Sequence, residues 1–322
     1  MKIEIDKELY EACEVALKDC MGVKEGEIVS IITDEEKRNI GVHLWLKAKE
    51  LGTEAIYMEM LPRKMHGEEP PPPIAEAMKS SDVVLAPTSK SITHTLAKKE
   101  ACERGTRVAT LPGITEEIFI RTLKVNYEEI LQITNRVAEI LDRGERVEIL
   151  TSSGTNLKFY ITERQAKRST GIYKRVGECG NIPGAEAFIA PVEGTAEGIV
   201  VIDGSMAGIG LLKNPIKLII KDGKVKDIEG QEEAEKLKEI LSGYGEEARN
   251  IGEFGIGTNP QAMISGNILE DEKVLGTIHI ALGSNIDFGG TVRAPIHLDG
   301  IVKSPTVIVD GKPLMREGKL LI

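Results

Sequence analysis

The sequence predicts an α/β domain with a parallel sheet, followed by an α+β, mainly antiparallel domain. In residues 1–145, short apolar runs alternate with helical patterns, which is typical of a parallel sheet covered by helices. In residues 146–322, short β runs are separated by glycines, and Asp222-Gly223 and Asp310-Gly311 are strong hairpin signals. We therefore expect two domains, 1–145 and 146–322.

The elements of the first domain follow one another in a regular order. Strands are predicted at Glu27–Thr33, Glu54–Met60, Asp82–Pro87 and Thr106–Pro112. Helices are predicted over the stretch that holds Ile40, Leu44, Ala48 and Leu51, from about Ile74, near Thr93–Arg104 and near Tyr127–Asp142. Neither GxGxxG nor GxxxxGK[ST] occurs, so no nucleotide site is predicted. The second domain is expected to contain one helix, near Gln231–Leu241.

Composition narrows the class of protein. The net charge of −10 disfavours a nucleic-acid-binding protein, which would carry a basic patch. No apolar run is long enough for a transmembrane helix, and the N-terminal stretch lacks the apolar core of a signal peptide. We expect a cytoplasmic protein without a nucleic-acid or membrane partner. The charged fraction of 29% and aromatic fraction of 4% favour a thermophilic source.

Two histidines and an aspartate lie close together in the last fifth of the chain. His297 and Asp299 form an H-x-D pair, and His279 precedes them in an apolar, strand-like run. Residues two apart on a strand point to the same face, so His297 and Asp299 would project together from one stiff element. These three side chains are the first candidates for metal ligands.

Two glutamates occur in similarly apolar surroundings, namely Glu186 and Glu253. Each of the five residues taken alone has an ordinary explanation, either a core histidine or an acidic residue at a strand end. Together they predict a metal site, because carboxylates and imidazoles suit zinc, cobalt or manganese, and five ligands suit two such ions. With only His279, His297 and Asp299 as ligands, the site would instead be the two-histidine, one-carboxylate triad that favours one iron(II) ion.

Four stretches of the second half resemble a known family. NIPGAEAFIAP, GEFGIGTNP, DEKVLGTIHIALG and PIHLDG are similar to motifs of the thermophilic metallo-aminopeptidases of the aminopeptidase T and aminopeptidase S type, which are leucyl aminopeptidases. The resemblance implies a homodimer that uses a metal-activated water to hydrolyse the N-terminal bond of a peptide. It assigns two divalent ions to Glu186, Glu253, His279, His297 and Asp299, and Glu253 is our first choice for the general base.

One position departs from the peptidase pattern. The peptidases have a tyrosine seven residues after the motif histidine, where this chain has Ile286, which cannot donate a hydrogen bond. The following loop is also shorter, and it is more similar to a related branch that includes 2,5-dihydroxypyridine 5,6-dioxygenase, an iron(II) ring-cleaving enzyme. Aminopeptidase activity is the leading prediction, an iron(II) dioxygenase is the alternative, and a non-enzymatic binding protein is a third. Arg293 is a candidate for anchoring a substrate carboxylate, and a solvated surface arginine is the alternative interpretation.

Overall fold

The computed structural model describes residues 5–322. The chain forms two compact units: Met1–Tyr127 with Gly171–Gly184, and Glu128–Thr170 with Ala185–Ile322. The sequence predicted a boundary between residues 145 and 146, which lies just after the long helix α6 (Tyr127–Arg143). In the structure all of this helix except Tyr127 belongs to the second unit. Segment Gly171–Gly184 leaves the second unit and returns to the first.

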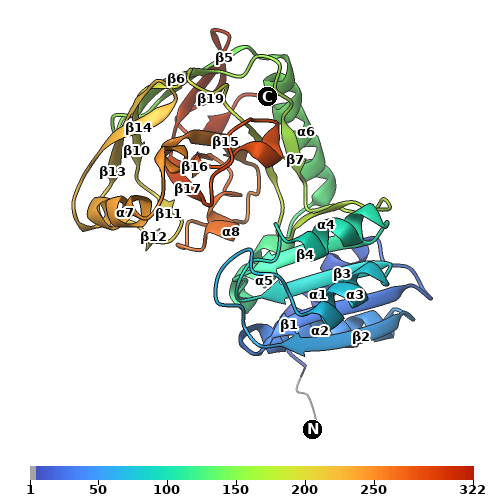
Figure 1. Cartoon of the computed structure of the whole chain (residues 1–322). Coiled ribbons are helices and arrows are strands. Elements are labelled where there is room, and N and C mark those ends of the chain that lie inside the picture. The colour runs from blue at the N-terminus through green and yellow to red at the C-terminus, as the bar shows by residue number, and fades with distance from the viewer. Residues whose placement is uncertain (1–4) are drawn as a thin grey trace. The chain divides into compact units, whose positions relative to one another are not determined.

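Unit 1 is built on a five-stranded parallel sheet in the order β2-β1-β3-β4-β8 (Figure 1). Its strands are β1 (Ile28–Asp34), β2 (Glu54–Met60), β3 (Val83–Thr88), β4 (Arg107–Pro112) and β8 (Cys179–Asn181). Its helices are α1 (Lys7–Glu14), η1 (Val15–Cys20), η2 (Glu35–Lys37), α2 (Arg38–Glu50), α3 (Pro72–Lys79), α4 (Leu96–Glu103) and α5 (Glu116–Leu123). The predicted parallel sheet is thus confirmed.

Local sequence explains why these elements form where they do. All six residues of β3 are buried, as expected for a strand covered on both faces. The hydroxyls of Thr95 and Thr115 cap α4 and α5 by accepting backbone N–H bonds from Lys98 and Ile118. The fifth strand, β8, was not predicted because its three residues, Cys179–Asn181, carry no β-type pattern.

Unit 2 contains two sheets. The eight-stranded sheet has the order β14-β13-β10-β6-β5-β18-β19-β20, and the seven-stranded sheet has the order β12-β11-β17-β16-β15-β9-β7. The first is formed by β5 (Arg146–Leu150), β6 (Asn156–Tyr160), β10 (Glu197–Ile202), β13 (Ile216–Lys221), β14 (Lys224–Glu229), β18 (Thr306–Val309), β19 (Lys312–Arg316) and β20 (Lys319–Leu320). The second is formed by β7 (Lys167–Ser169), β9 (Glu186–Ile189), β11 (Ser205–Met206), β12 (Gly210–Leu211), β15 (Ile251–Gly257), β16 (Thr277–Gly283) and β17 (His297–Lys303). The helices are α6 (Tyr127–Arg143), α7 (Glu232–Ser242), η3 (Glu246–Arg249), α8 (Ile268–Asp271) and η4 (Ile286–Phe288).

Both predicted hairpins are confirmed. β13 and β14 pair antiparallel around Asp222-Gly223, and β18 and β19 around Asp310-Gly311. Both residues of each turn have positive φ, 52° and 73° in the first and 49° and 77° in the second. This is the turn type that Asp-Gly favours. Every strand pair within the two sheets is antiparallel, which confirms the predicted character of this unit.

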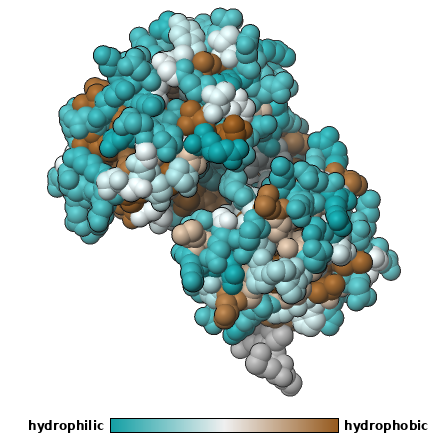
Figure 2. Space-filling view, in the orientation of Figure 1, coloured by the Kyte–Doolittle hydropathy of each residue, from teal (hydrophilic) through white to brown (hydrophobic). Residues whose placement is uncertain are grey.

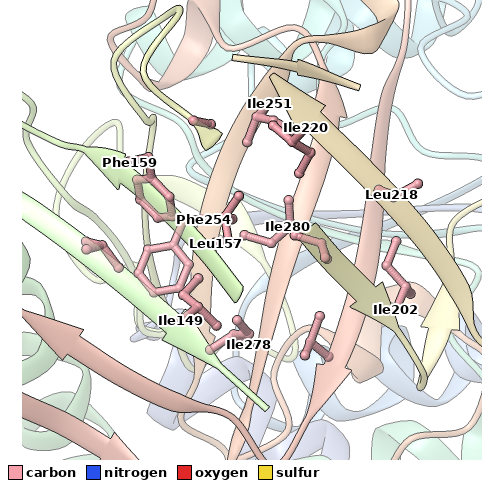
Figure 3. Close-up of a cluster of buried hydrophobic side chains, with 14 of the residues drawn as sticks. Ile149, Leu157, Phe159, Ile202, Leu218, Ile220, Ile251, Phe254, Ile278 and Ile280 are labelled. Atoms are coloured by element: carbon pink, nitrogen blue, oxygen red, sulfur yellow. The ribbon is translucent and has the colours of Figure 1, made fainter. Parts of the chain in front are cut away.

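The main hydrophobic core of unit 2 joins side chains from both sheets (Figure 3). Phe159 of β6 and Phe254 of β15 meet edge to face, with ring centroids 5.4 Å apart. Ile278 and Ile280 of β16 belong to the same cluster. Because strand side chains alternate between faces, the residues between these core positions must point to the opposite face of the seven-stranded sheet. That face carries the candidate site.

Among the described residues, no helix is long and apolar enough to cross a membrane. On the face of the molecule drawn in Figure 2, hydrophilic residues predominate and the apolar ones form small separate groups.

Candidate metal centre

Four neighbouring strands of the seven-stranded sheet supply the predicted ligands. Glu186 begins β9, Glu253 lies in β15, His279 in β16, and His297 and Asp299 in β17. The sheet places these strands side by side in the order β17-β16-β15-β9. The alternating positions, Phe254, Ile278 and Ile280 among them, pack into the core. The five polar side chains therefore share the face away from the core.

Small residues make room for these side chains on the same face. Gly255 pairs with His279 across the strands, and Ala281 pairs with Asp299. A Cβ added at Gly255 would lie 1.9 Å from Nε2 of His279, so only glycine permits the imidazole ring to lie across this strand. Glycine at this position thus fixes where the imidazole can lie.

The five predicted ligands form one continuous set of contacts. His279 Nε2 lies 3.6 Å from Glu186 Oε2 and 3.1 Å from Glu253 Oε1. His297 Nε2 lies 3.2 Å from Glu253 Oε2 and 3.5 Å from Asp299 Oδ1. Glu253 therefore bridges the two imidazoles with its two oxygens. The structure brings together all five residues that the sequence singled out, and their role as ligands stays a prediction.

A lysine that the sequence analysis did not select lies in the same cluster. Lys273 is fully buried, and its Nζ donates to Glu186 Oε1 at 2.8 Å and to Glu272 Oε1 at 2.5 Å. A buried ammonium is tolerated only where carboxylates compensate its charge. Two of the acidic groups at this end of the cluster are thus already paired with a cation of the chain itself.

Protonation of the imidazoles reflects the surrounding carboxylates. Burial opposes the charge on His279, but the hydrogen bond to Glu253 and the negative charges of Glu186 and Asp299 outweigh it and raise its pKa to about 9. The pKa of His297 is also raised well above its usual value, because Asp299 and Glu253 outweigh burial. The same pairing lowers the pKa of Asp299 to about 2, against the effect of burial. Protons on the two imidazoles thus offset negative charge that a divalent ion would otherwise offset.

Glu272 behaves in the opposite way. Burial, together with the charges of Glu186 and Asp299, raises its pKa to about 8, although Lys273 opposes this shift. Its oxygen Oε1 nevertheless pairs with the Lys273 ammonium.

Several observations show that the cluster fits a cation. The buried oxygens Glu186 Oε2 and Asp299 Oδ1 and the nitrogen His279 Nδ1 have no hydrogen-bond partner, and a buried polar atom without a partner destabilises the fold. Two groups of ligand atoms each lie within 4.8 Å of one another, namely Glu253, His279 and Asp299, and Glu186, Glu272 and His279. These buried carboxylates and imidazoles could hold a metal ion.

An aromatic pair lies beside the most accessible ligand. The His297 side chain is 27% exposed, whereas that of His279 is fully buried, so solvent reaches the cluster at His297. The Phe288 ring meets His297 edge to face at a centroid distance of 5.1 Å, and it meets the Phe188 ring at 5.3 Å. Asn285 holds the loop that carries Phe288, because its side chain accepts from the Val292 N–H and donates to a carboxylate oxygen of Glu193.

Two further positions from the sequence analysis lie in the same loop region. Ile286, at the family tyrosine position, begins η4 and is 36% exposed. Arg293 is exposed, and among residues 5–322 no hydrogen bond or ion pair joins it to the cluster. Its substrate-binding role therefore rests on the sequence alone.

A family model described as 2,5-dihydroxypyridine 5,6-dioxygenase matches residues 8–322, which is nearly the whole chain. The chain belongs to this family.

Two curated relatives represent two enzyme classes. The 2,5-dihydroxypyridine 5,6-dioxygenase of Pseudomonas putida is 22% identical over 263 residues, which cover 76% of this chain and 72% of the relative. Aminopeptidase PepS of Streptococcus thermophilus is 25% identical over 201 residues, which cover 53% of this chain and 48% of the peptidase, about half its length. The relatives of this family member are thus enzymes, both oxygenases and hydrolases.

Two solved structures share the fold. The Pseudomonas putida dioxygenase has a TM-score of 0.83 at 19% identity and covers 97% of this chain and 96% of its own. AmpT from Thermus thermophilus has a TM-score of 0.75 at 20% identity, covering 98% of this chain and 99% of its own. The predicted kinship with the aminopeptidases and with the dioxygenase branch is confirmed.

Three residues in or beside the candidate site do not stand out in the sequence, namely Glu272, Lys273 and Phe288. Glu272 and Lys273 lie in the quoted motif DEKVLGTIHIALG, where adjacent opposite charges look like a solvated turn. Phe288 lies in a glycine-rich loop. The apolar stretch after Lys273 was the available signal, because a lysine next to a buried strand needs a partner.

Proposed function

We propose that this chain is a mononuclear, iron(II)-dependent oxygenase that cleaves a hydroxylated aromatic ring. The proposal names His279, His297 and Asp299 as the metal-binding residues, with Glu253 beside them. When bound, iron(II) in a two-histidine, one-carboxylate set leaves open positions for oxygen and substrate. The membership of the family and the aromatic surroundings of His297 support this choice over a hydrolase.

The observation that carries the proposal is the buried ammonium of Lys273. It lies 2.8 Å from Glu186 Oε1 and 2.5 Å from Glu272 Oε1, which belong to the second of the two possible metal groups. A second divalent ion there would face this positive charge at short range and in a poorly screened interior. Lys273 therefore takes the part that a second metal would play in a two-metal hydrolase.

Charge balance agrees with one metal ion. Lys273 already pairs with Glu186 and Glu272, so the carboxylates of the second group have a positive charge of the chain between them. One divalent ion with neutral imidazoles would compensate Glu253 and Asp299, whose pKa values are both lowered. A second divalent ion beside Lys273 would bring like charges together in the buried cluster.

The surrounding residues suit a planar ring with hydroxyl groups. Phe188 and Phe288 offer half-buried aromatic edges and faces beside His297, on the accessible side of the cluster. The pKa of Glu253 is lowered, because its hydrogen bonds to the two imidazoles outweigh burial. It is therefore ionised and can accept the proton of a ring hydroxyl that reaches the site. Ile286 adds apolar surface where the peptidases have a hydroxyl donor.

A metal-dependent aminopeptidase is the second candidate. It is supported by the presence of all five predicted ligands in one cluster and by the likeness to aminopeptidase PepS and AmpT. In that reading Glu186, Glu272 and His279 hold the second ion, and Lys273 has to move away from both carboxylates.

Oxygen uptake and peptide hydrolysis distinguish the two candidate functions. Anaerobically purified protein loaded with iron(II) is given a dihydroxypyridine or another dihydroxylated ring, and oxygen uptake is followed. The oxygenase proposal expects ring-dependent oxygen uptake and no release of amino acids from leucyl peptides. Peptide hydrolysis by zinc- or manganese-loaded protein, without any ring-dependent oxygen uptake, would overturn it.

A further inference from the structure

Two of the four cysteines lie together in unit 1, far apart in sequence and outside the metal cluster. Cys102 is in the last turn of α4, and Cys179 begins β8. Both side chains are half-buried and pack against the same apolar cluster. Cys13 and Cys20, by contrast, are fully buried. The chain thus contains one accessible thiol pair and two thiols without access to solvent.

Backbone contacts hold the two cysteine-bearing segments together. The Gly177 N–H donates to Gly105 O at 2.9 Å, and the Val108 N–H donates to Glu178 O at 3.1 Å. A Cβ added at Gly177 would lie 2.8 Å from Cys102 O, so the segment before β8 packs tightly on the end of α4. The two thiols therefore meet because the fold brings their backbones together.

A lysine lies one helical turn before Cys102. Lys98 and Cys102 are four residues apart on α4, so they share one face of the helix. The positive charge of Lys98 lowers the pKa of the Cys179 thiol, and Glu178 is the negative group that acts against it. A thiol beside an ammonium and a second thiol, with access to solvent, is the arrangement found at redox-sensitive cysteines.

We propose that Cys179 and Cys102 form an oxidation site for hydroperoxides, with Cys179 as the attacking thiolate and Cys102 as the resolving thiol. The Cys179 sulfur attacks the terminal peroxide oxygen, the O–O bond breaks, and an alcohol or water leaves after taking up one proton. Cys179 is then a sulfenic acid. Cys102 loses its proton and attacks that sulfur, the S–O bond breaks, and a second water leaves. Both sulfurs are oxidised to one disulfide, and the peroxide is reduced.

The protonation preferences of the two thiols agree with these roles. The neighbouring Cys102 thiol, helped by Lys98 and opposed by burial, lowers the pKa of Cys179 to about 6. The same pairing, together with burial, raises the pKa of Cys102. Burial raises the pKa of Cys20 to about 12 and raises that of Cys13 as well, so neither competes as a nucleophile at neutral pH.

The test uses the full-length protein, reduced and then treated with hydrogen peroxide, with and without a metal chelator so that iron-catalysed oxidation is recognised. Free thiols are alkylated and the chain is digested without reduction. We expect a Cys102–Cys179 linked peptide, with Cys13 and Cys20 recovered as alkylated thiols. Linkage of other pairs, or no linkage while the thiols stay free, would overturn the proposal.

Two variants separate the roles. In Cys102→Ser, Cys179 is expected to remain a sulfenic acid that a dimedone probe traps, whereas Cys179→Ser is expected to give no probe adduct. Lys98→Met is expected to slow alkylation of Cys179 about twofold near pH 7, as a rise of about one unit in the pKa of that thiol would give. If a variant fails to fold, the pH dependence of the Cys179 alkylation rate in the unmodified chain tests the proposal. A Cys179 rate with its midpoint at the ordinary thiol pKa, about 8.5, contradicts the proposal.

Discussion

Lys273 and Glu186 form an ion pair in which neither residue is appreciably exposed, with Nζ 2.8 Å from Oε1. The same ammonium holds Glu272, so one lysine neutralises the end of the cluster where a second metal would bind. This pair links the packing of the site to its chemistry. It also gives the account a direct structural test.

Replacing Lys273 by methionine should change how many ions the protein binds. The variant leaves Glu186 without its cation, and removal of one partner of a buried pair costs about 3–5 kcal/mol. We expect the metal-free variant to lose stability in urea unfolding and to regain most of it with zinc, while the bound metal rises from one to two ions per chain. Lys217→Met, which removes an exposed pair with Glu229, is the control and should leave both quantities nearly unchanged. A variant that still binds a single ion would count against the idea that Lys273 blocks the second site.

Gly255 is predicted to be essential for the position of His279. In Gly255→Ala the new methyl would lie 1.9 Å from Nε2 of His279, so the imidazole must leave its place over the strand. We expect zinc affinity, measured by calorimetry, to fall by at least tenfold. Gly243→Ala is the matched control, because its added methyl would meet only Ile240 O at 3.7 Å and should leave affinity unchanged. Equal affinity in the two variants would show that His279 is not a ligand.

Metal affinity and metal-free stability should respond to pH in opposite directions. The pKa of His279 is about 9 in the folded, metal-free protein, above the ordinary 6.5. The proton therefore stabilises the metal-free fold fully below about pH 6.5, and this contribution, on the order of 3 kcal/mol, is lost as pH rises towards 9. Zinc needs the unprotonated imidazole, so the rise in melting temperature on adding zinc should grow over the same range. A zinc effect that shrinks with rising pH would refute the proton–metal competition.

Phe288 is predicted to contact the substrate and not to hold the metal. Its ring lies 5.1 Å from that of His297 but offers no ligand atom. For Phe288→Ala we expect unchanged metal content and a KM for a dihydroxylated ring raised about fivefold, as one lost aromatic contact of about 1 kcal/mol would give. Ile286→Ala, two residues away in the same short helix η4, should change KM less. Loss of metal from Phe288→Ala would assign the ring a structural role instead.

Much of the fold follows from local sequence patterns. Glu54–Met60 is predicted and found as β2, and the two Asp-Gly turns produce the hairpins that they signal. The return of β8 to the first sheet could not be predicted, because a strand of three residues leaves no periodicity and its pairing with β4 is a long-range contact.

Part of the candidate site could also be predicted from local sequence patterns. His279, His297 and Asp299 stand out because polar residues interrupt apolar strands, and the two-residue alternation correctly places them on one face. Lys273 did not stand out, because only the tertiary structure shows that a lysine beside two acidic residues is buried between Glu186 and Glu272. In the proposed function the number of metals depends on that single burial, which no local pattern encodes.

The number of iron ions per chain distinguishes the one-metal oxygenase from the two-metal hydrolase. For protein purified without oxygen and saturated with iron(II), elemental analysis should give one iron per chain, and this protein should consume oxygen when a dihydroxylated ring is added. Two ions per chain in the unmodified protein, with Lys273 in place, would rule out the one-metal site and favour the hydrolase.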